Sequence, residues 1–131
     1  MSGYKNAETA TTRHDELLGS TNNISTTTIV MDSSARDTDN TANPLYLRRG
    51  LLVTKIAATG KYKEYDNTAT DGSENEEDAV VLEHDILMNG NDDAVAAGYV
   101  QAVLRGDAII YKNPASKAAF DWSACQKLVR L

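Results

Sequence analysis

The chain has 131 residues, which suffice for one ordinary domain and leave little room for a second. Its 19 acidic and 13 basic side chains give a formal net charge of −6, which argues against non-specific nucleic-acid binding because such binding needs clustered lysine and arginine. Because no apolar run approaches the roughly 18 residues of a membrane-spanning helix and the amino-terminal residues lack a signal peptide's pattern, we expect neither nucleic acid nor a membrane among the partners.

The first 43 residues have the composition of an unfolded segment. They contain nine threonines and five serines, with only scattered large apolar side chains. Such a stretch buries too little apolar area to offset the entropy that it loses on ordering. We therefore predict a flexible arm over residues 1–43 and a compact body over residues 44–131.

One island in this arm has the chemistry of a β-strand. Residues 24–31 are rich in β-branched side chains and have turn-forming residues on both sides. Because no hairpin partner stands beside it in the sequence, the island is a candidate for adding to an open sheet edge on another protein. Two alternatives stay open, namely that it pairs with the body's own sheet or is a spacer. The partner-binding residues predicted here are Ile24, Thr26, Thr27, Thr28, Ile29, Val30 and Met31.

Short apolar stretches separated by turns make up the body. Alternation and β-branched side chains predict strands, and clusters of glycine, asparagine and aspartate between them predict turns. The predicted strands are residues 51–56, 61–65, 79–87, 94–104 and 108–111.

A helix is predicted near the carboxyl end. Asn113 suits the N-cap and Pro114 the first helical position, and good helix formers follow through Cys125, with Phe120 on the stripe that faces the core. Residues 129–131 are expected to form a final short strand. The whole order predicts an α+β fold, in which an extended arm precedes a mainly β compact domain, small and barrel- or sandwich-like, with one C-terminal helix.

The residues that could carry chemistry form no catalytic or metal-binding pattern. Eleven carboxylates and no lysine or arginine lie from Glu64 to Asp93, but their spacing does not match a calcium loop, so we interpret them as a solvated acidic face. His14 and His84 lie far apart in the sequence, and Cys125 is expected to be a buried apolar side chain. No nucleophile elbow or Walker loop is present. The sequence therefore predicts a protein that is not an enzyme, with no catalytic residue, no metal and no cofactor.

The order of the predicted elements resembles that of a known protein family. A paired strand around residues 49–53 is followed by Thr59-Gly60-Lys61-Tyr62, Asp71-Gly72, the stretch 79–82, a late strand ending at residues 103–106, an Ala-rich segment and an apolar carboxyl end. Over roughly residues 45–131, with a polar arm ahead, this order resembles the head decoration proteins of tailed bacteriophages, typified by that of lambda. The acidic insertion around residues 71–78 departs from the common pattern.

The resemblance implies a capsid decoration (cementing) role in the virion. Proteins of this kind bind as homotrimers on the outer surface of the expanded head and clamp neighbouring subunits of the major capsid protein. The implied partners are the major capsid protein and further copies of this chain, after synthesis in the host cytoplasm. The arm would add a strand to a capsid-protein sheet, so residues 24–31 are expected to be disordered in solution and ordered on the capsid. Two alternatives stay open: another virion module, such as a tail or fibre attachment protein, or an adaptor domain with a peptide-ligand arm.

Three further side chains are possible trimer or capsid contacts. Arg48 and Arg49 could pair with acids on a partner, or they could remain solvated. Trp122 could pack in the core or at a subunit contact, and the enrichment of tryptophan at interfaces favours the contact.

Overall fold

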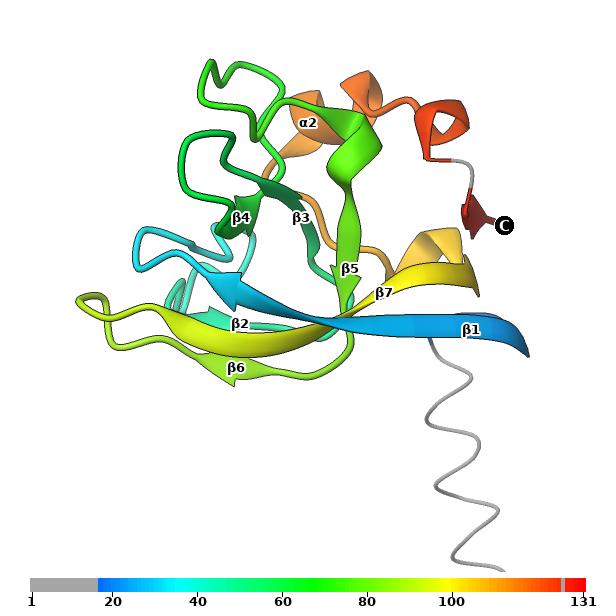
Figure 1. Cartoon of the computed structure of the whole chain (residues 1–131), viewed down its shortest axis with the longest axis horizontal. Helices are drawn as coiled ribbons and strands as arrows, with labels where there is room; N and C mark the ends of the chain where they lie inside the picture. Colours follow the sequence, from blue (N-terminus) through cyan, green and yellow to red (C-terminus); the bar gives the residue numbers. More distant parts are fainter. Residues whose placement is uncertain (1–16, 126) are drawn as a thin grey trace, which may run out of the picture.

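The computed structural model describes residues 17–125 and 127–131. The strands in this part of the chain are β1 (Leu18–Met31), β2 (Tyr46–Leu47), β3 (Leu52–Lys55), β4 (Tyr62–Glu64), β5 (Val80–Leu82), β6 (Ile86–Leu87), β7 (Ala94–Leu104) and β8 (Leu128–Arg130). They are joined by one short helix, α2 (Pro114–Ala119), and by 3-10 helices at Glu76–Asp78, Gly106–Ala108 and Trp122–Ala124. The fold is therefore mainly β with one short C-terminal helix, which confirms the predicted class (Figure 1).

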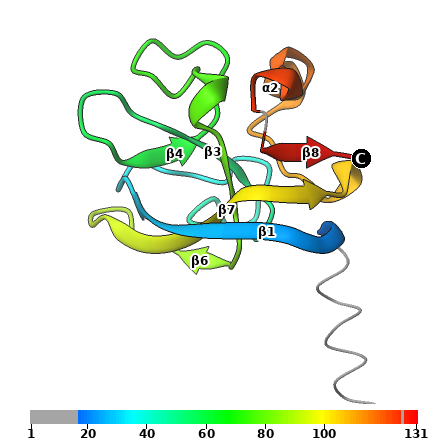
Figure 2. The same cartoon turned by 45° about the vertical axis from the view of Figure 1, so that its right-hand side comes forward.

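Five of the strands close into a barrel. They pair in the order β1-β4-β3-β5-β7, and β7 pairs again with β1. The sheet is mixed, because β1 runs parallel to β4 and β8 runs parallel to β7. The short strands β2 and β6 form a separate antiparallel pair. The long strands β1 and β7 run side by side along one side of the barrel in both views (Figures 1 and 2).

Alternate residues of the barrel strands supply two hydrophobic cores. On β3, Leu52 and Val53 belong to different cores, as expected for successive side chains that point to opposite faces of a strand. The outer core lies under the C-terminal segment, where the rings of Tyr65 and Phe120 meet edge to face at 4.9 Å. It consists of Leu17, Leu18, Leu52, Tyr65, Ala79, Val81, Tyr99, Ala102, Leu104, Ile109, Tyr111, Phe120, Cys125 and Leu128. The inner core consists of Ile29, Met31, Ala35, Leu47, Leu51, Val53, Val80, Leu82, Met88 and Ala96.

The close approach of β5 and β7 depends on Gly98. This glycine pairs with Leu82 of β5. A Cβ atom at position 98 would lie 2.1 Å from Cγ1 of Val80, which is closer than any real contact. The glycine inside β7 therefore permits the barrel to close between β5 and β7.

β1 places part of the predicted arm inside the body. The sequence predicted a flexible segment over residues 1–43, whereas the described fold begins at Leu17 and β1 pairs with β7 along its length. Ile29 and Met31 are buried in the inner core, and this burial with the β7 ladder offsets the entropy of ordering. Residues 24–31 therefore pair with the body's own sheet, which was one of the alternatives left open by the sequence. The rest of the predicted arm, residues 1–16, lies outside the described residues.

The strands of the body differ from the prediction where turns interrupt them. β7 has the predicted bounds, while the predicted strand 79–87 divides into β5 and β6 around a bend at residues 83–85. The predicted strand 108–111 keeps only a single parallel bridge between Leu51 and Ile110.

The C-terminal helix begins as predicted and ends early. Asn113 caps it, because its Oδ1 accepts a hydrogen bond from the backbone N–H of Ser116 at 2.8 Å, and Pro114 takes the first turn. The backbone is extended at Phe120, and Asp121 then caps the 3-10 helix Trp122–Ala124 by accepting from the N–H of Ser123. Local side-chain hydrogen bonds of this kind compete with a continuing α-helix. The predicted final strand is present as β8.

Candidate functional site

One edge of β1 is open over most of its length. β7 covers the other edge from Leu18 to Met31, while β4 meets the open edge only where Met31 pairs with Tyr62. In the strand pairings of the described residues, nothing covers this edge from Ile24 to Ile29.

The direction of the backbone groups along β1 follows from one hydrogen bond. The N–H of Asp32 donates to the carbonyl of Tyr62 at 2.8 Å, so the backbone of this even-numbered residue faces the β4 side. Residues 26–31 pair one to one with residues 99–94 of β7 without a bulge. Because the groups alternate along a strand, the N–H and C=O of Thr26 and Thr28 and the N–H of Val30 face the open edge, while the parallel bridge between Met31 and Tyr62 occupies the C=O of Val30.

The predicted partner-binding residues divide into two groups in the structure. Ile29 and Met31 are buried in the inner core. The others are exposed: Ile24, Thr26, Thr27, Thr28 and Val30. On β7, the neighbour of Val30 is Val95, whose side chain is 72% exposed. The exposed part of the island therefore combines an open backbone edge with a small outward apolar surface.

The side chain of Arg48 pairs with acidic side chains of its own chain. Its Nε lies 2.8 Å from Oδ2 of Asp37, which is completely buried, and its Nη2 lies 3.1 Å from Asp37 Oδ1 and 3.0 Å from Asp39. The hydrogen bond with Asp37 is the main reason why the pKa of Arg48 is raised. The backbone N–H of Asn40 donates to the carbonyl of Asp37, which closes a turn at this residue. That Asp37 is a buried partner of Arg48 was missed, because neither residue type is distinctive in a polar segment.

Arg49 is also held by its own chain. Its backbone N–H donates to Asp85 at 2.6 Å, its Nε donates to the carbonyl of Glu83 at 3.0 Å, and its Nη2 reaches the hydroxyl of Tyr99 at 3.3 Å. These bonds tie the start of β3 to the β5–β6 bend and to β7.

Trp122 packs against the outer core. Its ring lies 4.8 Å from that of Phe120, edge to face. The indole is partly exposed. The structure therefore gives Arg48, Arg49 and Trp122 structural partners within the chain, and a contact of any of them with another molecule stays a prediction.

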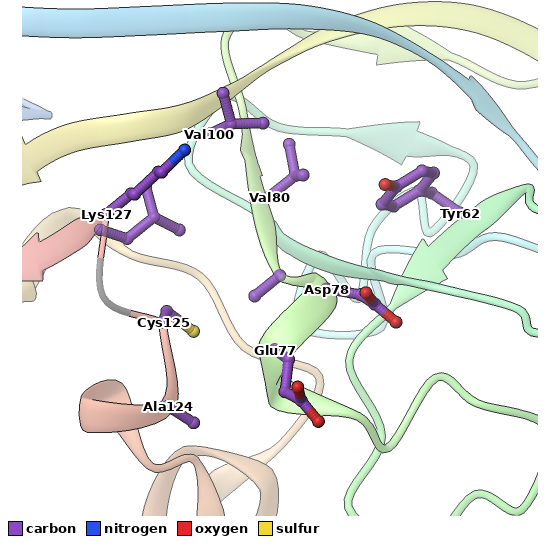
Figure 3. A pocket seen from close by; sticks show the side chains of 10 residues that line it. Tyr62, Glu77, Asp78, Val80, Val100, Ala124, Cys125 and Lys127 are labelled. Carbon is purple, nitrogen blue, oxygen red and sulfur yellow. The ribbon is translucent and has the colours of Figure 1, made fainter.

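A groove opens at the mouth of the barrel (Figure 3). Val80, Val100 and Tyr62 form its floor, and their side chains point toward one space. Glu77 and Lys127 stand at its rim, and the groove has a volume of about 540 Å³. It is therefore a hollow with an apolar floor and charged side chains at its edge.

The thiol beside this groove is not a nucleophile. Cys125 is buried, as predicted, and its Sγ donates a hydrogen bond to the carbonyl of Glu76 at 2.8 Å. Burial, with a smaller contribution from Glu76 and Asp121, raises the pKa of the thiol to about 11. A thiolate is thus scarce at neutral pH.

The acidic region is held by separate local contacts. Asp66 pairs with Lys112 at 2.8 Å and Asp93 pairs with Lys61 at 2.7 Å. Across residues 17–125 and 127–131, no three histidine, cysteine or acidic side chains are grouped so that they could hold a metal ion. No helix in the described part of the chain is long and apolar enough to cross a membrane.

The Asp66–Lys112 pair predicts a loss of stability in acid. The hydrogen bond from Lys112 holds the pKa of Asp66 at about 2, below the ordinary 3.8, so the pair stabilises the fold above pH 3.8 and this contribution disappears as the pH falls toward 2. Lys112→Met should remove roughly 1–2 kcal/mol at pH 7, and wild type and variant should converge near pH 2. Urea unfolding between pH 2 and pH 7 measures this difference, and a gap that stays constant with pH would contradict the assignment.

Comparison with known proteins identifies a family whose model matches this chain. The family model described as bacteriophage lambda head decoration protein D matches residues 7–128, which is nearly the whole chain. A search of curated proteins gave no match. The family match covers the barrel, the C-terminal segment and all of β1.

Proposed function

The chain belongs to the bacteriophage lambda head decoration protein family, a family of structural capsid proteins, and from this premise we propose how it acts. It binds as trimers on the outer surface of the expanded head and clamps neighbouring subunits of the major capsid protein. The open edge of β1 pairs with a strand of that capsid protein, so that one sheet runs across the contact. The protein reaches this place after synthesis in the host cytoplasm.

The observation that carries the proposal is the unprotected edge of β1. Exposed sheet edges are normally blunted by charges, proline or very short strands, because they otherwise invite pairing with other chains. The segment Leu18–Met31 is long and contains neither a charged residue nor a proline. Its edge presents the N–H and C=O groups of Thr26 and Thr28 and the N–H of Val30, which is the arrangement needed for strand addition. The island predicted from the sequence thus takes the role of a docking edge that is already folded.

Trimer formation is supported by the surface and by the energetics of weak contacts. Leu87 and Val95 are each about 70% exposed, and Tyr46 pairs with Leu87 on the outward face of the β2–β6 sheet. Exposed apolar side chains of this kind are suited to contacts between copies. A trimer would bring three β1 edges to the capsid together, so each edge needs only a modest affinity.

Binding stoichiometry on expanded empty heads tests the proposal. The purified chain should saturate the heads near one copy per major capsid subunit, and sedimentation of the free protein should show a trimer or a monomer–trimer equilibrium. Saturation at a handful of copies per head would instead indicate a tail or fibre attachment module. An absence of binding, or a strict dimer, would contradict the decoration role proposed here.

A further inference from the structure

We propose that the groove at the barrel mouth selects the strand that pairs with β1. The occupant is an extended segment of the major capsid protein with an apolar side chain and, on the same face, a lysine or arginine. This inference rests on the strand addition proposed above. Backbone pairing alone would accept almost any extended chain, whereas a pocket beside the edge reads alternate side chains.

The groove lies where an added strand would bring its side chains. At Tyr62, β4 takes the position next to β1, so a strand paired with Thr28 and Val30 would end against Tyr62, which lines the groove. Val100 also lines it, and this residue stands on β7 between the partners of Ser25 and Thr26. The inward face of an added strand would therefore stand over the groove, between these two side chains.

The floor of the groove suits an apolar side chain. Val80 is buried at 2% exposure, and Val100 and Tyr62 pack against the inner core while remaining partly exposed. Covering such a floor removes apolar surface from water and contributes roughly 25 cal/mol for each Å². The volume of about 540 Å³ lies within the range of roughly 300–1,000 Å³ typical of ligand pockets. One apolar side chain and the stem of a long basic one fit this space.

The rim of the groove supplies the charge preference. Glu77 and Asp78 line it next to each other, and among the described residues neither carboxylate forms an ion pair. Glu76, by contrast, accepts a hydrogen bond from the N–H of Asp121 and is already engaged. Lys127 is the one basic side chain that lines the groove among the described residues, so the lining carries two negative charges and one positive charge. A partner lysine or arginine complements this rim.

Charge reversal at the rim tests the inference. Glu77→Lys should weaken binding to expanded empty heads roughly 10-fold or more and should make the remaining affinity less dependent on salt, because a favourable charge contact becomes repulsive. Asp107→Lys is the matched control: it makes the same change at an exposed residue in the turn after β7, outside this groove, and should leave the affinity within about 2-fold. Both variants should unfold at the temperature of the wild type.

A second pair of variants tests the apolar floor. Val100→Thr keeps the shape of the side chain and puts a hydroxyl on the floor, whereas Val95→Thr makes the same change on the exposed outer face of β7. Val100→Thr should weaken head binding several-fold more than Val95→Thr, because desolvating an unpaired hydroxyl costs roughly 1–3 kcal/mol.

The outcomes separate this inference from the function on which it rests. If the wild type decorates heads and a proline in the β1 edge abolishes decoration, but the groove variants bind like their controls, then strand addition stands and the groove has no role in selection. If the edge proline also has no effect, both ideas are wrong. A loss of binding in Asp107→Lys equal to that in Glu77→Lys would show that overall charge, not the groove, governs binding.

Discussion

Thr28→Pro is expected to weaken the binding to expanded heads about 100-fold while the protein stays folded. The N–H of Thr28 faces the open edge of β1, so the proline removes a donor that β7 does not use. On the capsid the same change deletes a hydrogen bond of the added strand and leaves its partner carbonyl unsatisfied. That loss corresponds to roughly 1–3 kcal/mol, and the bulk of the proline ring adds to it, so the affinity should fall about 100-fold. Co-sedimentation of the variant with empty expanded heads measures the effect.

Two neighbouring variants make this result specific. Thr28→Val keeps the backbone N–H and should bind as the wild type does. Thr27→Pro removes a donor on the β7 side of the strand, so it should lower the unfolding midpoint clearly more than Thr28→Pro. If Thr28→Pro unfolds while Thr27→Pro does not, the assignment of backbone groups to the two edges is wrong. If Thr28→Pro is folded and still saturates the heads with the wild-type affinity, the open edge of β1 is not the docking edge.

Asp37→Ala is expected to lower the free energy of unfolding by roughly 3–5 kcal/mol. Asp37 is completely buried, and its carboxylate accepts from Nε and Nη2 of Arg48 and from the backbone N–H of residue 48 at 3.2 Å. Removing this buried carboxylate leaves Arg48 with only the exposed Asp39 and takes the acceptor from a backbone N–H, which is far more costly than losing a surface pair. Equilibrium unfolding in urea, followed by the fluorescence of Trp122, gives the difference.

The neighbouring acid supplies a matched control. Asp39 pairs with the same guanidinium at 3.0 Å, but its side chain is 61% exposed. Asp39→Ala should therefore cost less than about 1 kcal/mol. The double variant Asp37→Leu/Arg48→Met removes both charges of the pair and should recover much of the stability lost by Asp37→Ala. Equal losses from Asp37→Ala and Asp39→Ala would show that burial of the first carboxylate is unimportant.

Asp37 also connects stability with the docking edge. The backbone N–H of Asp37 donates to the carbonyl of Pro44 at 2.8 Å, and its side chain fixes Arg48, so the connection from β1 to β2 is held to the barrel at this residue. Loosening this connection would leave β1 attached mainly through β7 and the inner core. The position of the edge that we propose for the capsid thus depends on a buried charge pair several residues away.

Local sequence determined those features that depend on neighbouring residues. The sequence predicted the bounds of β7, the cap of α2 at Asn113 and the strand character of residues 24–31. Each of these features follows from side-chain propensity or from a hydrogen bond to a residue three positions away. The mainly β class followed from the same local signals. The succession of elements was enough to indicate the family whose model matches the chain.

The tertiary structure decided which partners these elements have. The polar composition of residues 1–43 predicted disorder, but β1 is ordered because β7, far along the chain, covers one edge and the inner core buries Ile29 and Met31. In the same way Arg48 and Arg49 resemble solvated surface residues in the sequence and are held by Asp37 and Asp85 in the fold. Burial and long-range pairing are properties of the folded chain as a whole, so no local pattern specifies them. The sequence by itself determined that residues 24–31 form a strand, and only the tertiary structure decided that one edge of this strand is used by the barrel and the other is open.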